Sequence, residues 1–285
     1  MKYKGLYLNL DRSPERRQGI EQELARNGLS GYTRFAASDG NAMNFLNLGL
    51  KQGEMGCFTS YFRLLSEQVS CAEPLHLIED DILLSPQTGP VLDWVIESSN
   101  LDKYDIVFTD VAVPLLNDAC HAYKALYDAA VKRDASGKIE SVAFSVIDMR
   151  ELIFASTCSF MVNPQSIGKL ARLFGEALYK GAPQPIDLYI RTLCQGGVIK
   201  VGCLFPFVTS IPIGNALDSQ IEKPCDESPS LASNILRHSF FIGSDWNKCY
   251  DLAARIFPQP LENDNHRQMM LKLLGYSLTA EYRKG

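Results

Sequence analysis

The sequence has too few cysteines and histidines, too widely scattered, for a disulfide scaffold or a structural zinc site. Only 8 of its 285 residues are cysteine and 4 are histidine, and no two cysteines are spaced C-x2-C. Small secreted scaffolds carry a much higher cysteine density, and structural zinc sites draw on paired Cys and His ligands. We therefore predict ordinary thiols in a reducing compartment.

One cysteine has a spacing that resembles a phosphatase loop, because Cys57 and Arg63 are separated by five residues. The intervening FTSYF has no glycine and two phenylalanines. A phosphate-binding loop needs a tight backbone turn that presents consecutive N–H groups. The segment is typical of a helix instead, and we set the phosphatase interpretation aside.

The chain also lacks an excess of basic charge and a long apolar run. Its 28 Lys and Arg face 33 Asp and Glu, a formal net charge of −5, which argues against a sequence-independent nucleic-acid binder. No stretch of 18 apolar residues is present, and charge returns soon after the short N-terminal run YLNL, so we expect neither a membrane span nor a signal peptide. The sequence predicts a soluble, cytoplasmic protein.

Strand and helix patterns alternate through the first 110 residues, in a chain of ordinary globular composition. Apolar runs at 3–10, 75–78 and 105–110 predict strands. Helices are predicted from Ser13-Pro14 to a stop at Gly28, from Gly53 onward, and after Ser85-Pro86. The second helix has an apolar stripe at helical spacing: Phe58, Phe62, Leu65 and Val69. This alternation predicts an α/β protein with a mostly parallel sheet.

The second half of the chain is less regular. A hairpin is predicted around Ser136-Gly137, followed by strands near 156–163 and 198–205 and helices near 165–180 and 186–194. The stretch 211–230 reads as a loop, and the last 55 residues as helical, with Leu252, Ile256, Leu271 and Leu274 buried. We predict one α/β domain over residues 1–230 and a helical extension over 231–285 that packs on it.

Glu79, Asp80 and Asp81 are the sharpest candidate site, because three acids directly follow an apolar strand. Ligands of open α/β sheets bind at the carboxyl ends of the strands. Three adjacent carboxylates repel one another, and a hard cation such as Mg²⁺ or Mn²⁺ offsets that charge and brings phosphate oxygens with it. An acidic turn that caps the next helix explains the pattern equally well. Phosphatases of the haloacid-dehalogenase type and toprim metal sites fit poorly, since Asp81 is followed by Ile-Leu-Leu and no second acidic strand can be placed.

Three further features carry weaker signals. Arg12, Arg16 and Arg17 open the first helix, where guanidinium groups and the helix N-terminus favour phosphate, although a solvated basic face paired with neighbouring acids is the simpler interpretation. Glu54 lies between two glycines at the start of a helix, where it favours the helix dipole. Asp187 follows Pro185 and is either a helix cap or a carboxylate general base.

Taken in order, these segments resemble glycosyltransferase family 25, which includes lipooligosaccharide-biosynthesis galactosyltransferases and collagen-modifying relatives. The shared segments are NLDRSPERR (9–17), FAASDG (35–40), GEMGC (53–57) with a serine at position 60, EDD (79–81) and PID (185–187). The resemblance is strongest over residues 3–90 and weaker through 150–215.

The resemblance implies a GT-A-like single Rossmann-type domain with a mostly parallel mixed sheet. It implies an inverting, metal-dependent transfer of a hexose, with galactose from UDP-galactose the favoured donor. The acceptor would be a saccharide, such as a lipopolysaccharide, lipooligosaccharide or capsule precursor. Such acceptors are glycans or lipid-linked glycans at the inner membrane, so the resemblance also implies peripheral contact with its cytoplasmic face.

Roles for single residues follow from the same resemblance. Asp81 and Glu79 would hold Mn²⁺ or Mg²⁺, Asp187 would be the general base, and Glu54 would assist in catalysis. The nucleotide sugar would contact a larger set: Asn9, Asp11, Arg12, Arg16, Asp39, Ser60, Tyr61 and Asp80.

The chain departs from the family at Tyr61, where a histidine usually follows the serine. Tyrosine keeps a hydrogen bond but not the proton chemistry of an imidazole. A non-catalytic protein that binds nucleotide sugars or glycans therefore stays open as an alternative. A sugar-phosphate nucleotidyltransferase is a second alternative, although Asp-Arg-Ser-Pro stands where those enzymes carry a glycine-rich loop.

Overall fold

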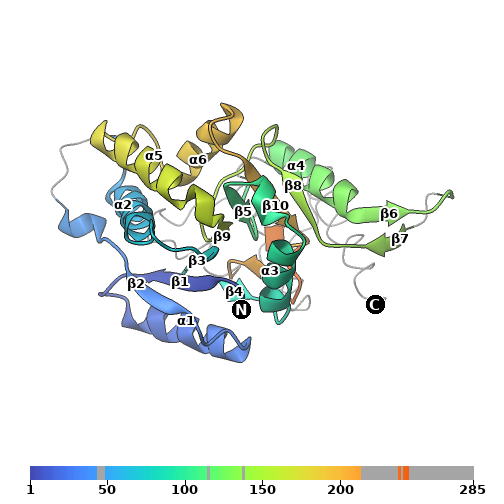
Figure 1. Ribbon diagram of the computed structural model, residues 1–285, viewed down its shortest axis with the longest axis horizontal. Helices are drawn as coiled ribbons and strands as arrows, with labels where there is room; N and C mark the ends of the chain where they lie inside the picture. Colours follow the sequence, from blue (N-terminus) through green and yellow to red (C-terminus); the bar gives the residue numbers. More distant parts are fainter. Residues whose placement is uncertain (44–48, 114–115, 137–138, 213–236, 239, 244–285) are drawn as a thin grey trace, which may run out of the picture.

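The computed structural model describes residues 1–43, 49–113, 116–136, 139–212, 237–238 and 240–243. Its centre is a seven-stranded sheet with the strand order β2-β1-β3-β9-β5-β10-β8 (Figure 1). β1 pairs in parallel with β2 and β3, and β5 pairs in parallel with β10. β9 runs antiparallel to both β3 and β5, and β8 antiparallel to β10. The predicted α/β class and the largely parallel mixed sheet are confirmed.

The first half of the chain builds one side of this sheet. Its elements are β1 (Lys4–Asn9), α1 (Pro14–Arg26), β2 (Thr33–Ala36), the short helix η1 (Gly40–Ala42), α2 (Gln52–Glu67) and β3 (Leu75–Glu79). β1 and β3 are buried almost throughout, as continuous apolar runs in parallel sheets are. Pro14 opens α1, and Gly28 adopts φ +70° just beyond its end, a conformation that favours glycine.

The second half completes the sheet and adds two small ones. Its helices are α3 (Thr88–Glu97), α4 (Leu116–Ala130), α5 (Ile167–Tyr179) and α6 (Ile186–Gln195), with short helices η2 (Leu101–Lys103) and η3 (Pro164–Ser166). Its sheet strands are β5 (Ile106–Phe108), β8 (Ser145–Asp148), β9 (Ser159–Val162) and β10 (Val201–Phe205). β4 (Leu83–Leu84) pairs with β11 (Thr209–Ser210), and β6 (Val131–Arg133) with β7 (Ile139–Val142).

Two apolar cores lie on the two faces of the sheet. α2, α4, α5 and α6 cover one face, and α1 and α3 cover the other (Figure 1). Phe58, Phe160 and Phe174 are fully buried in the larger core, while Ile20 and Leu92 belong to the smaller one. Helices on both faces leave the strand ends as the natural place for a site.

The structure corrects several details of the sequence predictions. The stripe of the second helix does not extend to Val69, because α2 ends at Glu67 and Val69 is 53% exposed. The irregular stretch after residue 110 contains the helix α4, which the sequence analysis did not predict. The predicted hairpin is confirmed as β6–β7, at the far right of Figure 1.

The predicted domain boundary at residue 230 and the buried positions Leu252, Ile256, Leu271 and Leu274 lie outside the described residues. In the part of the chain that the structure describes, no helix is both long and apolar enough to cross a lipid bilayer. The cysteines that it describes (57, 71, 158, 194 and 203) are free thiols, as predicted, and Cys57 packs against the larger core.

Candidate functional site

Three strands that point the same way bring polar side chains to one edge of the sheet. Asn9 ends β1, Glu79 ends β3, and Asp110 lies two residues beyond β5. β1 and β3 are parallel, and β5 has the same direction because β9 runs antiparallel to both β3 and β5. The carboxyl ends of these strands therefore form a shared edge, as binding sites in open α/β sheets require.

Asn9 connects the first strand to the acidic segment. Its amide nitrogen donates to Asp80 Oδ2 at 2.6 Å and to the Ser13 carbonyl at 3.0 Å. Arg34 donates to Asn9 Oδ1 at 3.0 Å and to Asp11 at 2.5 Å. Because Asn9 is buried with its donor and acceptor both used, it orients Asp80.

Arg16 neutralises two of the three acids. It forms ion pairs with Asp80, at 2.8 Å, and with Asp81. Burial raises the pKa of Asp80, although Arg16 and Asn9 oppose the shift. Asp81 has a buried Oδ1 with no hydrogen-bond partner among the described residues. A carboxylate oxygen in that position is a ready ligand for a cation or a donor group, since a buried polar atom without a partner is costly.

Glu79 is held from the opposite side by Tyr61 and Thr157. Its Oε1 accepts hydrogen bonds from the Thr157 hydroxyl at 3.0 Å and from Tyr61 Oη at 3.2 Å. Burial, and then the negative charge of Asp81, raises the pKa of Glu79 to about 7. Tyr61 is fully buried and its hydroxyl also donates to the Thr157 carbonyl at 2.6 Å, so the Thr157 carbonyl and the Glu79 carboxylate share one donor.

Two of the glycine-containing motifs pack directly against each other. A Cβ on Gly40 would lie 1.7 Å from the Gln52 carbonyl oxygen, and one on Gly56 would lie 2.7 Å from the Ser38 carbonyl oxygen. Ser60 joins the same two segments, since its hydroxyl accepts from the Ser38 N–H and donates to the Gly56 carbonyl. The glycines therefore allow close approach of α2 to the loop after β2. Ser60 serves this packing.

Other predicted residues lie at the rim or at helix ends. Arg12 donates to Asp39 at 2.7 Å, and the Asn41 N–H and Arg12 lower the pKa of Asp39. Glu54 accepts the Lys51 N–H at 2.8 Å and so satisfies a backbone donor at the start of α2. These contacts give Glu54 a structural function, and its part in catalysis stays a prediction.

Asp187 lies in the first turn of α6 and faces the loop before β9. Its two oxygens accept the N–H groups of Ser156, at 3.1 Å, and Leu188, at 2.9 Å. After burial itself, the charges of Glu79 and then of Asp187 raise the pKa of the Cys57 thiol. Asp187 and Glu79 accept hydrogen bonds from the adjacent loop residues Ser156 and Thr157, which places Asp187 close to the acidic segment.

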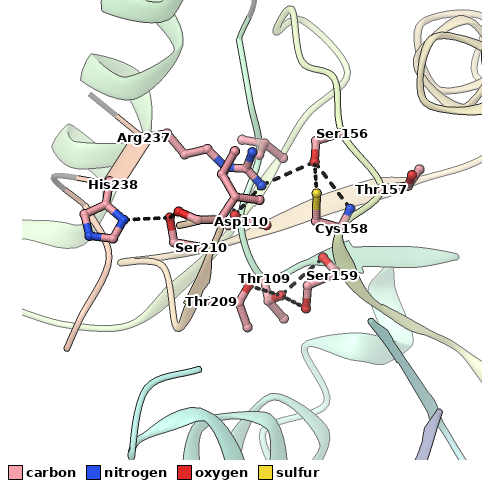
Figure 2. Close-up of polar contacts among 12 residues, drawn as sticks. Thr109, Asp110, Ser156, Thr157, Cys158, Ser159, Thr209, Ser210, Arg237 and His238 are labelled. Carbon is pink, nitrogen blue, oxygen red and sulfur yellow. Dashed lines mark hydrogen bonds and ion pairs between the residues drawn. The ribbon is translucent and has the colours of Figure 1, made fainter. Parts of the chain in front are cut away.

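A second ion pair at the same edge was missed by the sequence analysis. Arg237 donates through Nε to Asp110 Oδ2 at 2.7 Å, and both side chains are almost fully buried (Figure 2). Burial raises the pKa of Asp110 and Arg237 opposes the shift. The position of Asp110 just after an apolar strand was a usable signal, but no local pattern marks Arg237.

The structure thus gathers Asn9, Arg16, Tyr61, Glu79, Asp80 and Asp81 into one cluster, which we call the acidic site. Arg17 pairs with Glu21 on the helix surface, as the simpler interpretation predicts. Among the described residues, no three His, Cys, Asp or Glu side chains form a ready metal cluster. A cation held by Asp81 would complete its shell with substrate oxygens and water, as Mg²⁺ commonly does.

Comparison with known proteins adds one match. The model of glycosyltransferase family 25 (LPS biosynthesis protein) matches residues 4–187, well over half of the chain. The matched range contains the whole acidic site and ends at Asp187, while Arg237 lies beyond it. A search of curated proteins gives no match to the chain.

Proposed function

The chain belongs to glycosyltransferase family 25, and on that premise we propose that it moves a hexose from a nucleotide sugar to a saccharide hydroxyl with inversion at the anomeric carbon. The family's description as an LPS biosynthesis protein supports a lipopolysaccharide or lipooligosaccharide precursor as the acceptor, with a capsule precursor the next candidate. UDP-galactose is the donor that we propose first. The acceptor chemistry suggests work at the cytoplasmic face of the inner membrane.

The observation that carries this proposal is the unpartnered Oδ1 of Asp81 at the sheet edge. The oxygen belongs to a side chain next to Glu79 and Asp80, whose pKa values are raised first by burial and then by the negative charge of neighbouring acids. A nucleoside diphosphate with a divalent cation supplies the positive charge and the oxygen ligands that such a group lacks. The proposal also assigns Glu79 to the same cation.

Mn²⁺ or Mg²⁺ fits this donor set, because hard cations bind carboxylate oxygens. When bound, the cation would stabilise the negative charge that develops on the leaving diphosphate. Asn9 would keep Asp80 in place while Asp81 turns to the ligand. Arg16, whose side chain is 31% exposed, would then be released from Asp81 and could contact the diphosphate.

Inversion by direct displacement needs a base at the acceptor. The acceptor oxygen forms its bond to the anomeric carbon while the bond from that carbon to the diphosphate oxygen breaks, and the acceptor proton passes to a carboxylate. We propose Asp187 for this step. Its link to Glu79 through the adjacent residues Ser156 and Thr157 supports the assignment. The Ser156 and Leu188 N–H groups fix the orientation of Asp187, and its remaining lone pairs can accept a proton.

One observation favours the non-catalytic alternative. Arg16 already pairs with Asp81, and both oxygens of Asp187 already accept backbone N–H groups. A protein that binds nucleotide sugars without transferring them would also have these carboxylates occupied by protein donors. The replacement of the family's usual histidine by Tyr61 points the same way, although the buried hydroxyl preserves a hydrogen bond to Glu79.

A donor screen separates these functions. The protein is incubated with Mn²⁺ and a panel of UDP-sugars, and released UDP is measured together with nucleotide-sugar binding. The proposal predicts slow UDP release by hydrolysis, fastest with UDP-galactose, and faster release when a lipooligosaccharide acceptor is added. Binding without release from any sugar would favour the non-catalytic alternative, and release of pyrophosphate from UTP and a sugar phosphate would favour a nucleotidyltransferase.

A further inference from the structure

Arg237 is a buried cation that the proposed chemistry does not use. Its side chain is 2% exposed, and that of its partner Asp110 is fully buried. Removing two charges from water costs several kcal/mol per ion before their attraction is counted, so a buried pair is weak evidence for stability alone. The other contacts of Arg237 are therefore the better guide to its function.

The second partner of Arg237 is the hydroxyl of Ser156, which accepts a hydrogen bond from Nη2 at 3.2 Å (Figure 2). The same hydroxyl accepts the Cys158 N–H at 3.3 Å and donates to Cys158 Sγ at 3.0 Å. Ser156 has φ +82°, in the left-handed region that favours glycine. A residue other than glycine persists there only when surrounding contacts hold it.

The loop Ser156–Cys158 touches both candidate carboxylates. The Ser156 N–H donates to Asp187 at 3.1 Å, and the Thr157 hydroxyl donates to Glu79 at 3.0 Å. The Glu79 N–H in turn donates to the Cys158 carbonyl at 2.8 Å. A shift of this loop would therefore move Asp187 and Glu79 together.

Arg237 is itself anchored from both sides. Asp110 holds its guanidinium, and the backbone around it is tied to the core by the Phe207 N–H to the Phe240 carbonyl, at 3.0 Å, and by the Ile242 N–H to the Phe207 carbonyl, at 2.9 Å. Phe240 and Phe241 are buried. Arg237 therefore reaches the loop from a segment that is hydrogen-bonded to the core and lies beyond the family-matched range.

We propose that Arg237 is a positioning residue, which fixes the loop Ser156–Cys158 through the Ser156 hydroxyl and thereby sets the geometry of Asp187 and Glu79. The effect on catalysis rests on the proposed function. The claim about geometry does not, because the contact between Ser156 and Asp187 can be measured in a protein that transfers nothing.

Three single variants test the link without removing a buried charge. Ser156→Gly and Ser156→Ala delete the hydroxyl, and glycine tolerates φ +82° better than serine does. Arg237→Lys keeps a positive charge beside Asp110 but cannot match the fork that reaches two partners. Ser66→Ala is the matched control, because Ser66 is an exposed serine on α2 whose hydroxyl donates to the Phe62 carbonyl of the same helix.

We expect Ser156→Gly, Ser156→Ala and Arg237→Lys each to lower kcat for UDP release about 10- to 100-fold with little change in the KM for the nucleotide sugar, since small misplacements of reacting groups have effects of this size. The double variant Arg237→Lys/Ser156→Gly should be no slower than the slower single variant, because both changes break the same hydrogen bond between Arg237 and Ser156. Wild-type kcat in both Ser156 variants, or multiplicative losses in the double variant, would overturn the proposal.

Amide hydrogen exchange separates this inference from the proposed function. Faster exchange at the Ser156 amide in Arg237→Lys, with Ser66→Ala unchanged, is the expected result. Unchanged exchange would overturn the inference whatever the activity. A wild-type protein that releases no UDP would overturn the proposed function, and the exchange result would still decide whether Arg237 positions the loop.

Discussion

Two aspartate–arginine pairs at one edge of the sheet differ in their access to water. In the first, Arg16 is 31% exposed and Asp81 27% exposed, and we call this the open pair. In the second, Arg237 is 2% exposed and Asp110 fully buried, and we call this the closed pair. The open pair lies within the family-matched range, while the closed pair draws its arginine from beyond it.

The difference in exposure suggests different uses. An exposed ion pair contributes little to the free energy of unfolding. Either side chain can therefore leave its partner and bind a ligand with little loss of stability. A buried pair is expensive to break, because the remaining charge stays in the core without a partner. The open pair is therefore suited to binding a charged substrate, and the closed pair to holding a loop in place.

The largest expected effect comes from breaking the closed pair. Asp110→Ala leaves Arg237 buried without its carboxylate and should lower the free energy of unfolding by about 3–5 kcal/mol. Urea denaturation at neutral pH measures this. The control is Asp128→Ala, which breaks an exposed helical pair with Lys124 and should cost about 0.5 kcal/mol or less. A loss below about 1 kcal/mol in Asp110→Ala would contradict the assignment of a closed pair.

The next effect concerns His76, which lies on the same strand as Glu79 and is linked toward the closed pair. Its ring nitrogens contact Tyr32 and Ser159, and Ser159 contacts Thr109, the neighbour of Asp110. Burial lowers the pKa of His76 to about 3, well under its ordinary value of 6.5. Between these two pH values, His76 is therefore protonated in the unfolded chain and neutral in the folded chain.

Stability should consequently fall as the pH drops below about 6.5. At pH 5 the loss due to His76 is about 2 kcal/mol, from 1.36 kcal/mol per pH unit over about 1.5 units. Urea unfolding of the wild type and of His76→Gln at pH 7 and pH 5 measures it, with the exposed His121→Gln as control. If the free energy of unfolding fell equally between pH 7 and pH 5 in the wild type and in His76→Gln, His76 would be in contact with water and the prediction would be wrong.

The smallest effect on stability is expected at the open pair. Arg16→Gln should change the free energy of unfolding by about 1 kcal/mol or less, because Arg16 is partly exposed. It should weaken UDP binding in the presence of Mn²⁺ about tenfold, the size of one charge-assisted contact. Arg17→Gln is the matched control, since Arg17 pairs with Glu21 on the same helix. A large stability loss with unchanged UDP binding would reverse the two uses that we assign.

The open pair was largely accessible to sequence reasoning. Glu79, Asp80 and Asp81 follow an apolar strand, and Asn9 and Arg16 follow the first one, so a parallel sheet brings them to one edge. Their individual partners were not accessible. That Arg16 reaches Asp80 and Asp81 rather than a neighbouring acid depends on how α1 packs, and side-chain directions are not written in the local pattern.

The closed pair was beyond such reasoning for a physical reason. Asp110 and Arg237 are 127 residues apart, and no periodicity relates positions so distant. The antiparallel insertion of β9 between β3 and β5 is likewise a tertiary choice, because the apolar run of β9 fits either direction. α4 was missed although Ala119, Ala122, Tyr123 and Leu126 have helical spacing, since alanine contributes little to an apolar stripe.

The most direct test of the account is Mn²⁺-dependent UDP release by Asp81→Asn. This variant keeps the shape of a partly exposed side chain and removes the charge that the open pair offers to a ligand. We predict a melting temperature close to that of the wild type and a fall in UDP release from the best donor sugar of about 10²-fold or more. Wild-type rates of Mn²⁺-dependent release in a folded Asp81→Asn protein would contradict it.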